Sequence, residues 1–247
     1  MACLIKTSAP IRLQSHFGIC IQGKGSFFLI HVTGDLHGDI RRFDAPAVRR
    51  LKSGDSLIVC GDFGFIWNGD EAEQKVLQKL QKKKYQILFV DGPHENFDLL
   101  EQYPVEEWNG GKVHRIAENI LHLMRGEVFR IEGRLIFAFG GGESQEKHFR
   151  IDAGKWWAHE MPSLAEMKNG VENLQKNNFA VDYIITHSPC PGVGGFQFKQ
   201  NESTLDLYFE EIEKSVRHRK WFFGSTHINR HYTARCESVF DAVIPLQ

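Results

Sequence analysis

The sequence predicts an α/β protein in which two stacked sheets lie between layers of helices. Short apolar runs of strand length recur along the chain, and each ends abruptly in a glycine-containing turn with polar residues. Amphipathic helical segments separate several of these runs, which is the pattern of strands that pair at least partly in parallel. A central stretch and the C-terminal tail instead have the pattern of hairpins, and they indicate the second sheet.

The predicted strands share a high content of β-branched and aromatic residues. They are FFLIHV (27–32), SLIVC (56–60), YQILFV (85–90), LIFAF (135–139), VDYIIT (181–186) and KWFF (220–223). Because most of these runs are apolar nearly throughout rather than alternating, we expect strands that are buried on both faces.

Three segments combine one apolar face with polar residues elsewhere, as helices do. They are residues 70–84, 163–177 and 203–216. The first opens with Asp70 and Glu73 in the spacing of a capping box, and the second opens in the same way with Ser163 and Glu166.

The hairpin patterns lie in two places. Residues 119–139 predict three short strands with hairpin turns at 125–126 and 132–133, and residues 231–245 predict a further hairpin. With no repeat, low-complexity tract or linker in view, we expect one domain over residues 27–247. Residues 1–26 are expected to form an added strand or hairpin, and we assign them no function.

Composition and charge narrow the class of protein. Of 247 residues, 42% are hydrophobic and 25% charged, as in ordinary globular proteins, and the net charge of −1 gives no overall attraction to nucleic acid or anionic membranes. Five scattered cysteines without a CxxC pair favour reduced thiols over a disulfide framework. The first apolar run is too short for a signal peptide, and no run approaches the roughly 18 residues that span a bilayer. We therefore expect a soluble cytoplasmic protein.

Polar side chains follow directly after the predicted strands, where ligands gather in α/β sheets. They are Asp35, His37, Asp62, His94, His187 and His227. Any one of these histidines alone is explained as readily by a structural hydrogen bond. Six such residues at five strand ends favour a shared metal site, and their mixed oxygen and nitrogen donors suit manganese, iron, zinc, nickel or magnesium.

These strand ends carry ordered motifs that resemble those of a known family. The motifs are GDLHG (34–38), GD (61–62), GPHE (92–95), TH (186–187) and GSTH (224–227). In this order they are similar to the five signature blocks of calcineurin-like metallophosphoesterases, over about residues 27–228, and the segment 140–163 resembles small bacterial and phage members. The resemblance implies a four-layer α/β/β/α sandwich with two metal ions that share a bridging carboxylate.

The resemblance also assigns ligands to the two metals. It implies that Asp35, His37 and His227 hold the first ion, that Asp62 bridges to the second, and that His187 binds the second. Two cations in this arrangement neutralise phosphate oxygens and activate a water molecule for in-line attack.

The same resemblance places the remaining histidine, His94, beside the phosphate. There it would act as a general acid or as a stabiliser of negative charge. The two residues expected to take part directly in the reaction are therefore His94 and Asp62.

The sequence departs from the family pattern at two positions, and both belong to the second metal. Pro93 stands where the family has a ligating asparagine, and Ser225 stands where it has a histidine. The first site is therefore complete and the second is doubtful. Asp91 or Asn96 is a candidate replacement ligand, because Asp91 lies two positions before Pro93 and would face the same side of an extended strand.

Three outcomes stay open at this point. The protein is a phosphoesterase with one metal or a weak second one, a two-metal enzyme completed by water or backbone, or a fold that lost catalysis and senses a phosphate ligand or binds a protein. A nuclease within the same fold is a further alternative, although the net charge does not indicate a groove for nucleic acid.

Candidate substrate contacts lie after the predicted strand 135–139. Gly141 and Gly142 are small enough to let the backbone approach a phosphate, although a tight turn explains them as well. Arg150 lies in a segment expected to flank the site, where it would contact the substrate phosphate. A small phosphoester or a nucleotide is the expected partner, and the sequence does not indicate the oligomeric state.

Overall fold

The computed structural model describes residues 29–193 and 203–246, so the predicted N-terminal extension lies outside the described residues. Within them the strands form one sheet of seven and one of six. In order across the first sheet, the strands are β13 (Ile244–Pro245), β1 (Ile30–Thr33), β2 (Ser56–Cys60), β3 (Gln86–Val90), β6 (Ile120–Leu123), β5 (Gly111–Ala117) and β4 (Val105–Trp108). In order across the second, they are β11 (Arg230–His231), β12 (Cys236–Ser238), β10 (Lys220–Phe223), β9 (Tyr183–Thr186), β8 (Arg134–Phe139) and β7 (Glu127–Ile131).

Each sheet has a parallel centre and antiparallel edges. Strands β1, β2, β3 and β6 pair in parallel, as do β8, β9, β10 and β12. The strand ends that were predicted to carry the site therefore point the same way within each sheet.

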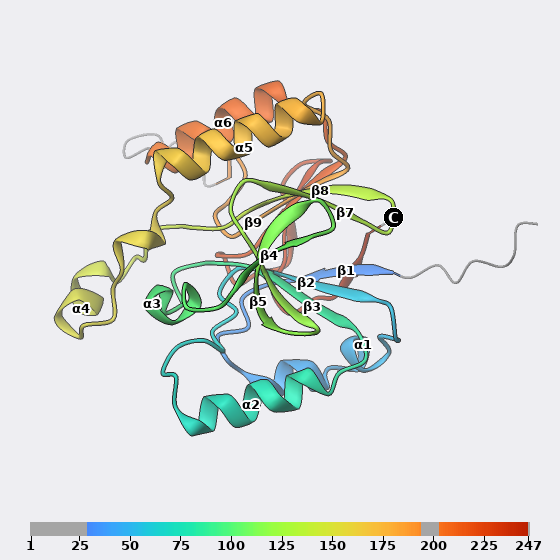
Figure 1. The fold of residues 1–247 in the computed structure, drawn as a ribbon. Coiled ribbons are helices and arrows are strands. Elements are labelled where there is room, and N and C mark those ends of the chain that lie inside the picture. The colour runs from blue at the N-terminus through green and yellow to red at the C-terminus, as the bar shows by residue number, and fades with distance from the viewer. Residues whose placement is uncertain (1–28, 194–202, 247) are drawn as a thin grey trace, which may run out of the picture.

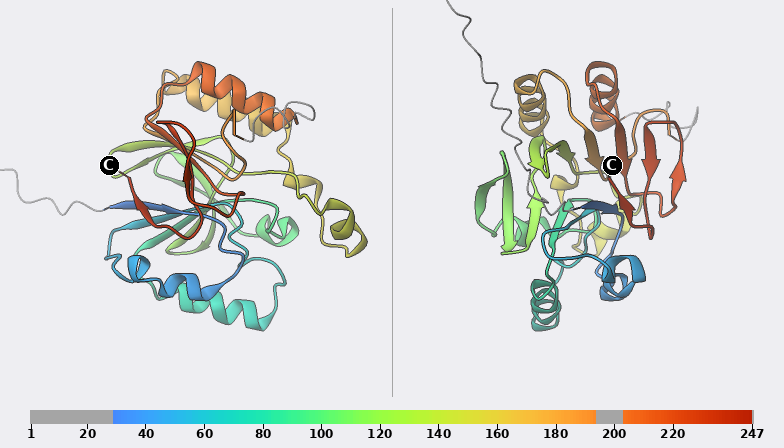
Figure 2. Two further views of the ribbon diagram at one scale, coloured as in Figure 1. Left: turned by 180° about the vertical axis from the view of Figure 1, so that it is seen from behind. Right: turned by 90° about the vertical axis from the view of Figure 1, so that its right-hand side faces the viewer.

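Helices cover the outer faces of both sheets. They are α1 (Pro46–Arg49), α2 (Glu71–Gln81), α3 (Phe97–Leu100), α4 (Lys147–Asp152), α5 (Leu164–Lys176) and α6 (Thr204–Ser215), with short 3-10 turns at η1 (Ile40–Asp44) and η2 (Ala158–Glu160). Figures 1 and 2 show α1 and α2 on one side of the stacked sheets and α5 and α6 on the other, while α4 projects from the body near α3. The predicted four-layer sandwich of mixed sheets and flanking helices is confirmed.

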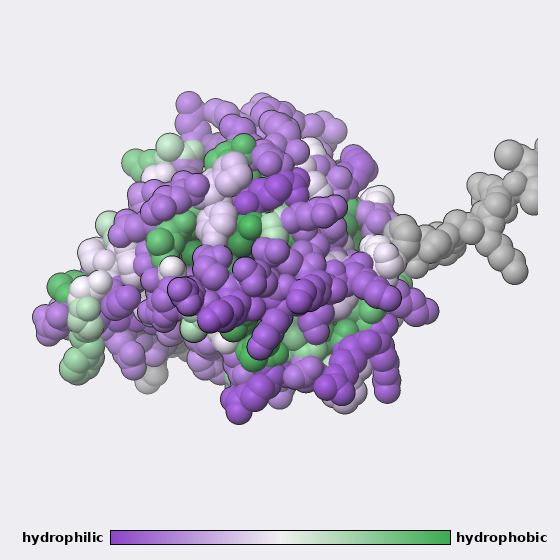
Figure 3. Space-filling view, turned by 60° about the horizontal axis from the view of Figure 1, so that its bottom comes forward, coloured by the Kyte–Doolittle hydropathy of each residue, from purple (hydrophilic) through white to green (hydrophobic). Residues whose placement is uncertain are grey.

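Burial on both faces explains the continuous apolar runs. In β2, Ile58 packs in the core between the sheets, whereas its neighbours Leu57 and Val59 pack in the core under α2. In the second sheet, Ile185 likewise faces the first sheet and Ile184 faces α5 and α6. Outside these cores the face that carries α1 and α2 is mostly hydrophilic (Figure 3), as solvent-facing helices require.

The predicted helix caps form, with one difference. Ser163 and Glu166 make the full capping box of α5. Asp70 caps α2 by accepting the Glu73 N–H at 2.8 Å, but the Glu73 carboxylate does not reach back. It accepts backbone N–H groups of the preceding loop instead, including that of Trp67 at 2.9 Å, and so fixes that loop beside the strand ends.

One predicted hairpin was wrong and another was confirmed. The turn at residues 125–126 joins β6 to β7, which lie in different sheets, so it is a crossover. The turn at residues 132–133 does join antiparallel β7 and β8, with Glu132 and Gly133 both at positive φ, as a tight two-residue turn needs. The segment 105–117, for which no strand was predicted, forms the antiparallel pair β4 and β5.

The C-terminal tail forms its hairpin and then changes sheets. Strands β11 and β12 pair antiparallel, as predicted for residues 231–245. The end of that segment, β13, instead pairs with β1 of the first sheet, where His31 lies opposite Pro245. The tail therefore joins the two sheets at one edge.

The cysteine prediction needs a correction. Cys190 and Cys236 form a disulfide between the turn after β9 and strand β12, and Cys60 is a buried free thiol. Their separation of 46 positions along the chain hides a pairing that only the fold brings about. The reduced-thiol argument therefore does not hold for this pair, and the cytoplasmic location stays a prediction. Within the described residues, no helix has the length and hydropathy to cross a membrane.

Candidate metal centre

Four side chains from separate parts of the chain meet where the parallel strands of both sheets end. Asp35 and His37 follow β1, Asp62 follows β2, and His227 follows β10. Each offers one ligand atom, and these atoms lie within 4.8 Å of one another. The four residues expected to hold or bridge the first metal are thus brought together.

The backbone at these four residues is unusual. Asp35, His37, Asp62 and His227 have φ values of 39°, 47°, 47° and 52°. The left-handed region is unfavourable for residues other than glycine and costs on the order of 1–3 kcal/mol at each position. Such outliers persist where the surrounding structure enforces them, and here they aim all four ligand side chains at one point.

Glycines in the motifs leave room for the ligands. A Cβ atom at Gly224 would lie 2.7 Å from Oδ1 of Asp35. A Cβ at Gly61 or Gly92 would collide with the His187 ring, and at Gly92 also with the Asp62 carboxylate. The glycines are therefore required by close packing of backbone against ligand side chains, and not by turn geometry alone.

The carboxylate of Asp35 lacks a full set of partners. Its Oδ1 accepts the Ser225 N–H at 3.0 Å, whereas its buried Oδ2 accepts no hydrogen bond from the described residues. Burial raises the pKa of Asp35 to about 6, against the opposing effect of nearby His187. An ionised carboxylate in this position needs a positive partner, which a metal ion would supply.

The two histidines of the cluster face each other. Nε2 of His37 lies 2.9 Å from Nε2 of His227 and 3.7 Å from Oδ2 of Asp62. Burial lowers the pKa of His37 to about 4, so that the ring is neutral near pH 7 and its lone pair is available to a cation.

His187 lies at the edge of this cluster. Its Nδ1 is 3.5 Å from Oδ1 of Asp35 and its Nε2 is 3.9 Å from Oδ1 of Asp62. The ring is buried, and Nδ1 makes no hydrogen bond with the described residues. His187 is therefore adjacent to the cluster but is not one of the four converging donors, and its role as a ligand stays a prediction.

His94 contacts the carboxylate expected to bridge. Its backbone N–H donates to Oδ1 of Asp62 at 2.8 Å, and its ring Nδ1 lies 3.0 Å from Oδ2. Burial favours a raised pKa for Asp62, but His187 and the His94 contacts outweigh it, so the pKa is lowered and the group is ionised. Nη2 of Arg150 lies 2.9 Å from Nε2 of this ring and 3.3 Å from its Nδ1.

Neither candidate replacement ligand joins the cluster. The buried Asp91 carboxylate is held by Arg125, whose Nε donates to Oδ2 at 2.9 Å, and by His122, whose Nε2 lies 3.0 Å from Oδ1. Asn96 caps α3, since its Oδ1 accepts the Leu99 N–H at 3.2 Å, and its amide donates to a backbone carbonyl. Both side chains are committed to structural partners, so this arrangement gives no support for either as a ligand.

The loop glycines after β8 lie close to the site. A Cβ at Gly142 would meet the side chain of Ser188 and the ring of His187, and a Cβ at Gly141 would lie 3.1 Å from the carbonyl of Glu160. The N–H groups of Gly141 and Gly142 donate to the carbonyls of Asp91 and Glu160, at 3.0 and 2.9 Å. These donors are therefore used within the fold, and the structure shows packing rather than a free phosphate contact.

A pocket of about 410 Å³ opens beside the cluster. His37 and His94 form its inner wall, and Trp67, Phe65 and Val76 contribute its apolar lining. Trp67 was not singled out from the sequence. The one sequence feature that could have indicated Trp67 is its position in the loop after the GD motif that follows β2. Its ring centroid lies 5.9 Å from that of His94, and this proximity depends on the fold.

The arrangement agrees with the sequence comparison. The family model described as calcineurin-like phosphoesterase matches residues 28–230. The chain belongs to the calcineurin-like phosphoesterase family. No curated protein sequence matches the chain.

Two solved structures match this family member at low sequence identity. One is assigned as a 5′-nucleotidase from Staphylococcus aureus, with 13% identity, a TM-score of 0.45, and coverage of 86% of this chain and 48% of that one. The other is a phosphopantetheinyl hydrolase from Mycobacterium tuberculosis, with 15% identity, a TM-score of 0.37, and coverage of 87% and 90%. The chain thus spans about half the length of the first.

The calcineurin-like phosphoesterase keeps a donor set that fits one divalent cation. Two carboxylates and two imidazoles converge, and Asp35, one of the two acids, has a buried oxygen without a hydrogen bond from the described residues. Manganese, iron, zinc and nickel accept such mixed ligands, whereas magnesium is more often bound by oxygen alone. For the second cation the fit fails, because Pro93 offers no side-chain donor atom.

Proposed function

We propose that this protein hydrolyses a small phosphomonoester or phosphodiester at one firmly held divalent cation. The observation that carries this proposal is the convergence of Asp35, His37, Asp62 and His227 within 4.8 Å. Family membership supports the class of reaction, and the donor set supports manganese, iron, zinc or nickel ahead of magnesium.

The cation would supply positive charge to the phosphate and lower the pKa of a water molecule. Asp35 and Asp62 would hold it as ionised carboxylates, and His37 and His227 as neutral rings. The hydrogen bonds of His94 to Asp62 fix the ring beside the cluster, with Nη2 of Arg150 2.9 Å from its Nε2 and 3.3 Å from its Nδ1. From there His94 can stabilise phosphate charge or give a proton to the leaving oxygen.

The adjoining pocket supports a substrate with an organic group next to the phosphate. Because His94 and His37 line the pocket, a phosphate beside them leaves its ester group against Trp67. An indole at this position favours a planar group, such as an aryl ring or nucleobase, over a plain aliphatic alcohol. A small phosphoester or nucleotide therefore fits better than a nucleic acid chain.

A panel of phosphoesters with added manganese tests the proposal. We expect turnover of aryl phosphates, nucleotides or cyclic nucleotides by the wild-type protein, and none by the Asp62→Asn variant. Absence of turnover across the panel, in protein that holds a cation and retains a phosphate ligand, would reject the hydrolase and favour the phosphate sensor. Tight, strongly salt-dependent binding of DNA or RNA would favour the nuclease instead.

A further inference from the structure

The second cation of the family lacks its donors in this chain. Pro93 and Ser225 replace two ligands, and Asp91 and Asn96 are bound to other protein groups. Both oxygens of Asp62 already accept hydrogen bonds from His94, at 2.8 and 3.0 Å, where the family's bridging carboxylate would bind a second ion. A phosphoester dianion at this site would therefore lack half of its expected countercharge.

A different positive group occupies this side of the site. Nη1 of Arg150 donates to the carbonyl oxygen of Pro93 at 2.5 Å. Pro93 is the residue that stands in place of the ligating asparagine. Nη2 of the same guanidinium lies 2.9 Å from Nε2 of His94. The same Nη2 lies 3.3 Å from Nδ1 of His94, the ring atom that contacts Asp62, so the guanidinium lies against both nitrogens of this ring.

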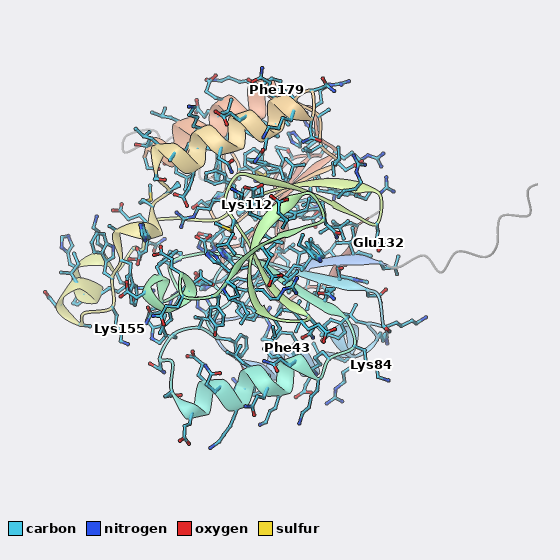
Figure 4. All side chains as sticks on the ribbon, in the orientation of Figure 1. Phe43, Lys84, Lys112, Glu132, Lys155 and Phe179 are labelled. Atoms are coloured by element: carbon cyan, nitrogen blue, oxygen red, sulfur yellow. A yellow bond between two sulfur atoms is a disulfide. The ribbon has the colours of Figure 1, made fainter. Side chains whose placement is uncertain are left out.

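The guanidinium is held in place by the segment that follows β8. Oε1 of Glu160, a residue with 0% exposure, lies 3.6 Å from Nη1 of Arg150. The other Glu160 oxygen accepts the Ser144 N–H at 3.0 Å, which fixes the carboxylate. Arg150 itself comes from α4, whose projecting segment also carries the labelled Lys155 in Figure 4.

Arg150 also contacts the wall of the pocket. Its guanidinium carbon lies 5.8 Å from the centre of the Trp67 ring, and only 12% of its side chain is exposed. Ionic and aromatic contacts on several sides leave the side chain little freedom, so it does not need to be ordered when a substrate binds.

We propose, on the basis of the function above, that the Arg150 guanidinium takes over the phosphate-binding role of the second cation. A guanidinium has five N–H donors, and among the described residues that of Arg150 donates hydrogen bonds only to Pro93 and His94, besides its ion pair with Glu160. The remaining donors form a planar fork that matches two phosphate oxygens. The protein is then a one-cation phosphoesterase with an arginine as its second positive group.

A guanidinium can replace only part of what a cation does. It neutralises and orients phosphate oxygens, but it cannot bind the carboxylate of Asp62 as a bridging ligand. In this structure both oxygens of Asp62 are instead within hydrogen-bonding distance of His94.

Removing the guanidinium tests the proposal without relying on turnover. In cation-loaded protein, Arg150→Ala should weaken the binding of inorganic phosphate about tenfold or more by calorimetry, because a charge-assisted hydrogen bond is lost. The cation content, measured by elemental analysis, should stay at one per chain. The phosphate affinity of Arg150→Lys should lie between those of wild type and Arg150→Ala, since lysine keeps the positive charge but lacks the planar pair of N–H donors.

A matched control uses an arginine remote from the site. Arg235 is exposed and pairs with Glu213, so Arg235→Ala should leave phosphate affinity and cation content unchanged. Equal phosphate affinity in wild-type protein and Arg150→Ala, with circular dichroism showing both folded, would overturn the proposal. So would two cations per wild-type chain.

Restoring the missing ligands gives an independent test. The double variant Pro93→Asn with Ser225→His should raise the cation content from one to two, and in the Arg150→Ala background it should recover most of the lost phosphate affinity. If the double variant does not fold, millimolar guanidinium chloride added to Arg150→Ala should recover phosphate binding instead. Recovery in neither case would contradict the proposal.

These readouts separate the two proposals. If no phosphoester is hydrolysed yet Arg150→Ala weakens phosphate binding at one cation per chain, the proposed hydrolase fails and the role of Arg150 stands. If hydrolysis occurs and phosphate binding does not depend on Arg150, the proposed hydrolase stands and the role of Arg150 fails.

Discussion

The site has two halves, the converging donors of the first metal and the end of strand β3, where the second metal was expected. Each half contains a buried aspartate, but the two carboxylates differ in their hydrogen bonds. On the first half, Asp35 is buried with 1% exposure, and one of its oxygens makes no hydrogen bond within the described residues. On the second half, Asp91 is equally buried, but Arg125 and His122 bind both of its oxygens. Both carboxylates follow a parallel strand, so their positions in the sequence look alike.

Their electrostatics differ accordingly. Burial raises the pKa of Asp35 to about 6, whereas Arg125 and His122 outweigh burial at Asp91 and lower its pKa. A buried acid without a partner marks a place for a ligand, and a buried acid with full partners marks a structural centre. Burial and residue type alone do not distinguish the two.

The largest effect is expected for the carboxylate at the centre of the first half. Asp62→Asn should lower turnover about a thousand-fold, because an amide carries no charge and binds a cation weakly. Kinetics with manganese, together with elemental analysis, would measure both losses. Full activity in this variant would remove Asp62 from the account.

Breaking the second half should damage stability rather than cation binding. Asp91→Asn removes the buried partner of Arg125 and leaves the guanidinium with the partly exposed Glu166 at 3.5 Å, and we expect a loss of about 3 kcal/mol in the free energy of unfolding. Urea unfolding measures it, with the exposed pair variant Asp44→Asn as a control that should change stability by about 0.5 kcal/mol or less. An unchanged unfolding midpoint, or a lost cation, would contradict the assignment.

A His94 variant should separate the effect on cation binding from the effect on turnover. His94→Ala should lower kcat about a hundred-fold while cation content stays the same, since His94 contacts Asp62 without belonging to the converging donors. The matched control is His231→Ala, at an exposed histidine that pairs with Glu237. A fall in cation content equal to the fall in activity would instead make His94 a holder of the ion.

The pH dependence of stability should have opposite sign for the two acids in metal-free protein. Asp91 has a lowered pKa when folded, so its contribution is present above about pH 4, the unfolded value, and is lost as the pH falls below it. Asp35 has a pKa of about 6 when folded, so its contribution is present below about pH 4 and is lost as the pH rises through 6. Unfolding of Asp35→Asn and Asp91→Asn against wild type from pH 2 to 7 would show the Asp91 dependence below pH 4 and the Asp35 dependence between pH 4 and 6, and parallel curves would contradict the difference.

The sequence predicted the parts that depend on local pattern. Strand β2 was predicted at its observed bounds of residues 56–60, and the donors that follow β1, β2 and β10 were placed at one sheet edge because parallel strands end together. The segment 105–117 was missed because its first strand, VEEW, lacks the apolar run used for the other strands.

Other features depend on contacts between distant residues. Asp91 was weighed as a metal ligand because its strand position favours that, and its true partner Arg125 lies 34 positions away in the crossover turn between β6 and β7. The approach of Arg150 to His94, over 56 positions, has the same origin. Periodicity describes the face on which a residue lies, but it does not describe which distant charge meets it.

The central claim is that one cation binds at Asp35, His37, Asp62 and His227. A crystal soaked in manganese and measured at a wavelength where manganese scatters anomalously tests it most directly. We predict a single strong anomalous peak among these four side chains. Two peaks of equal strength, or no peak at this position, would contradict it.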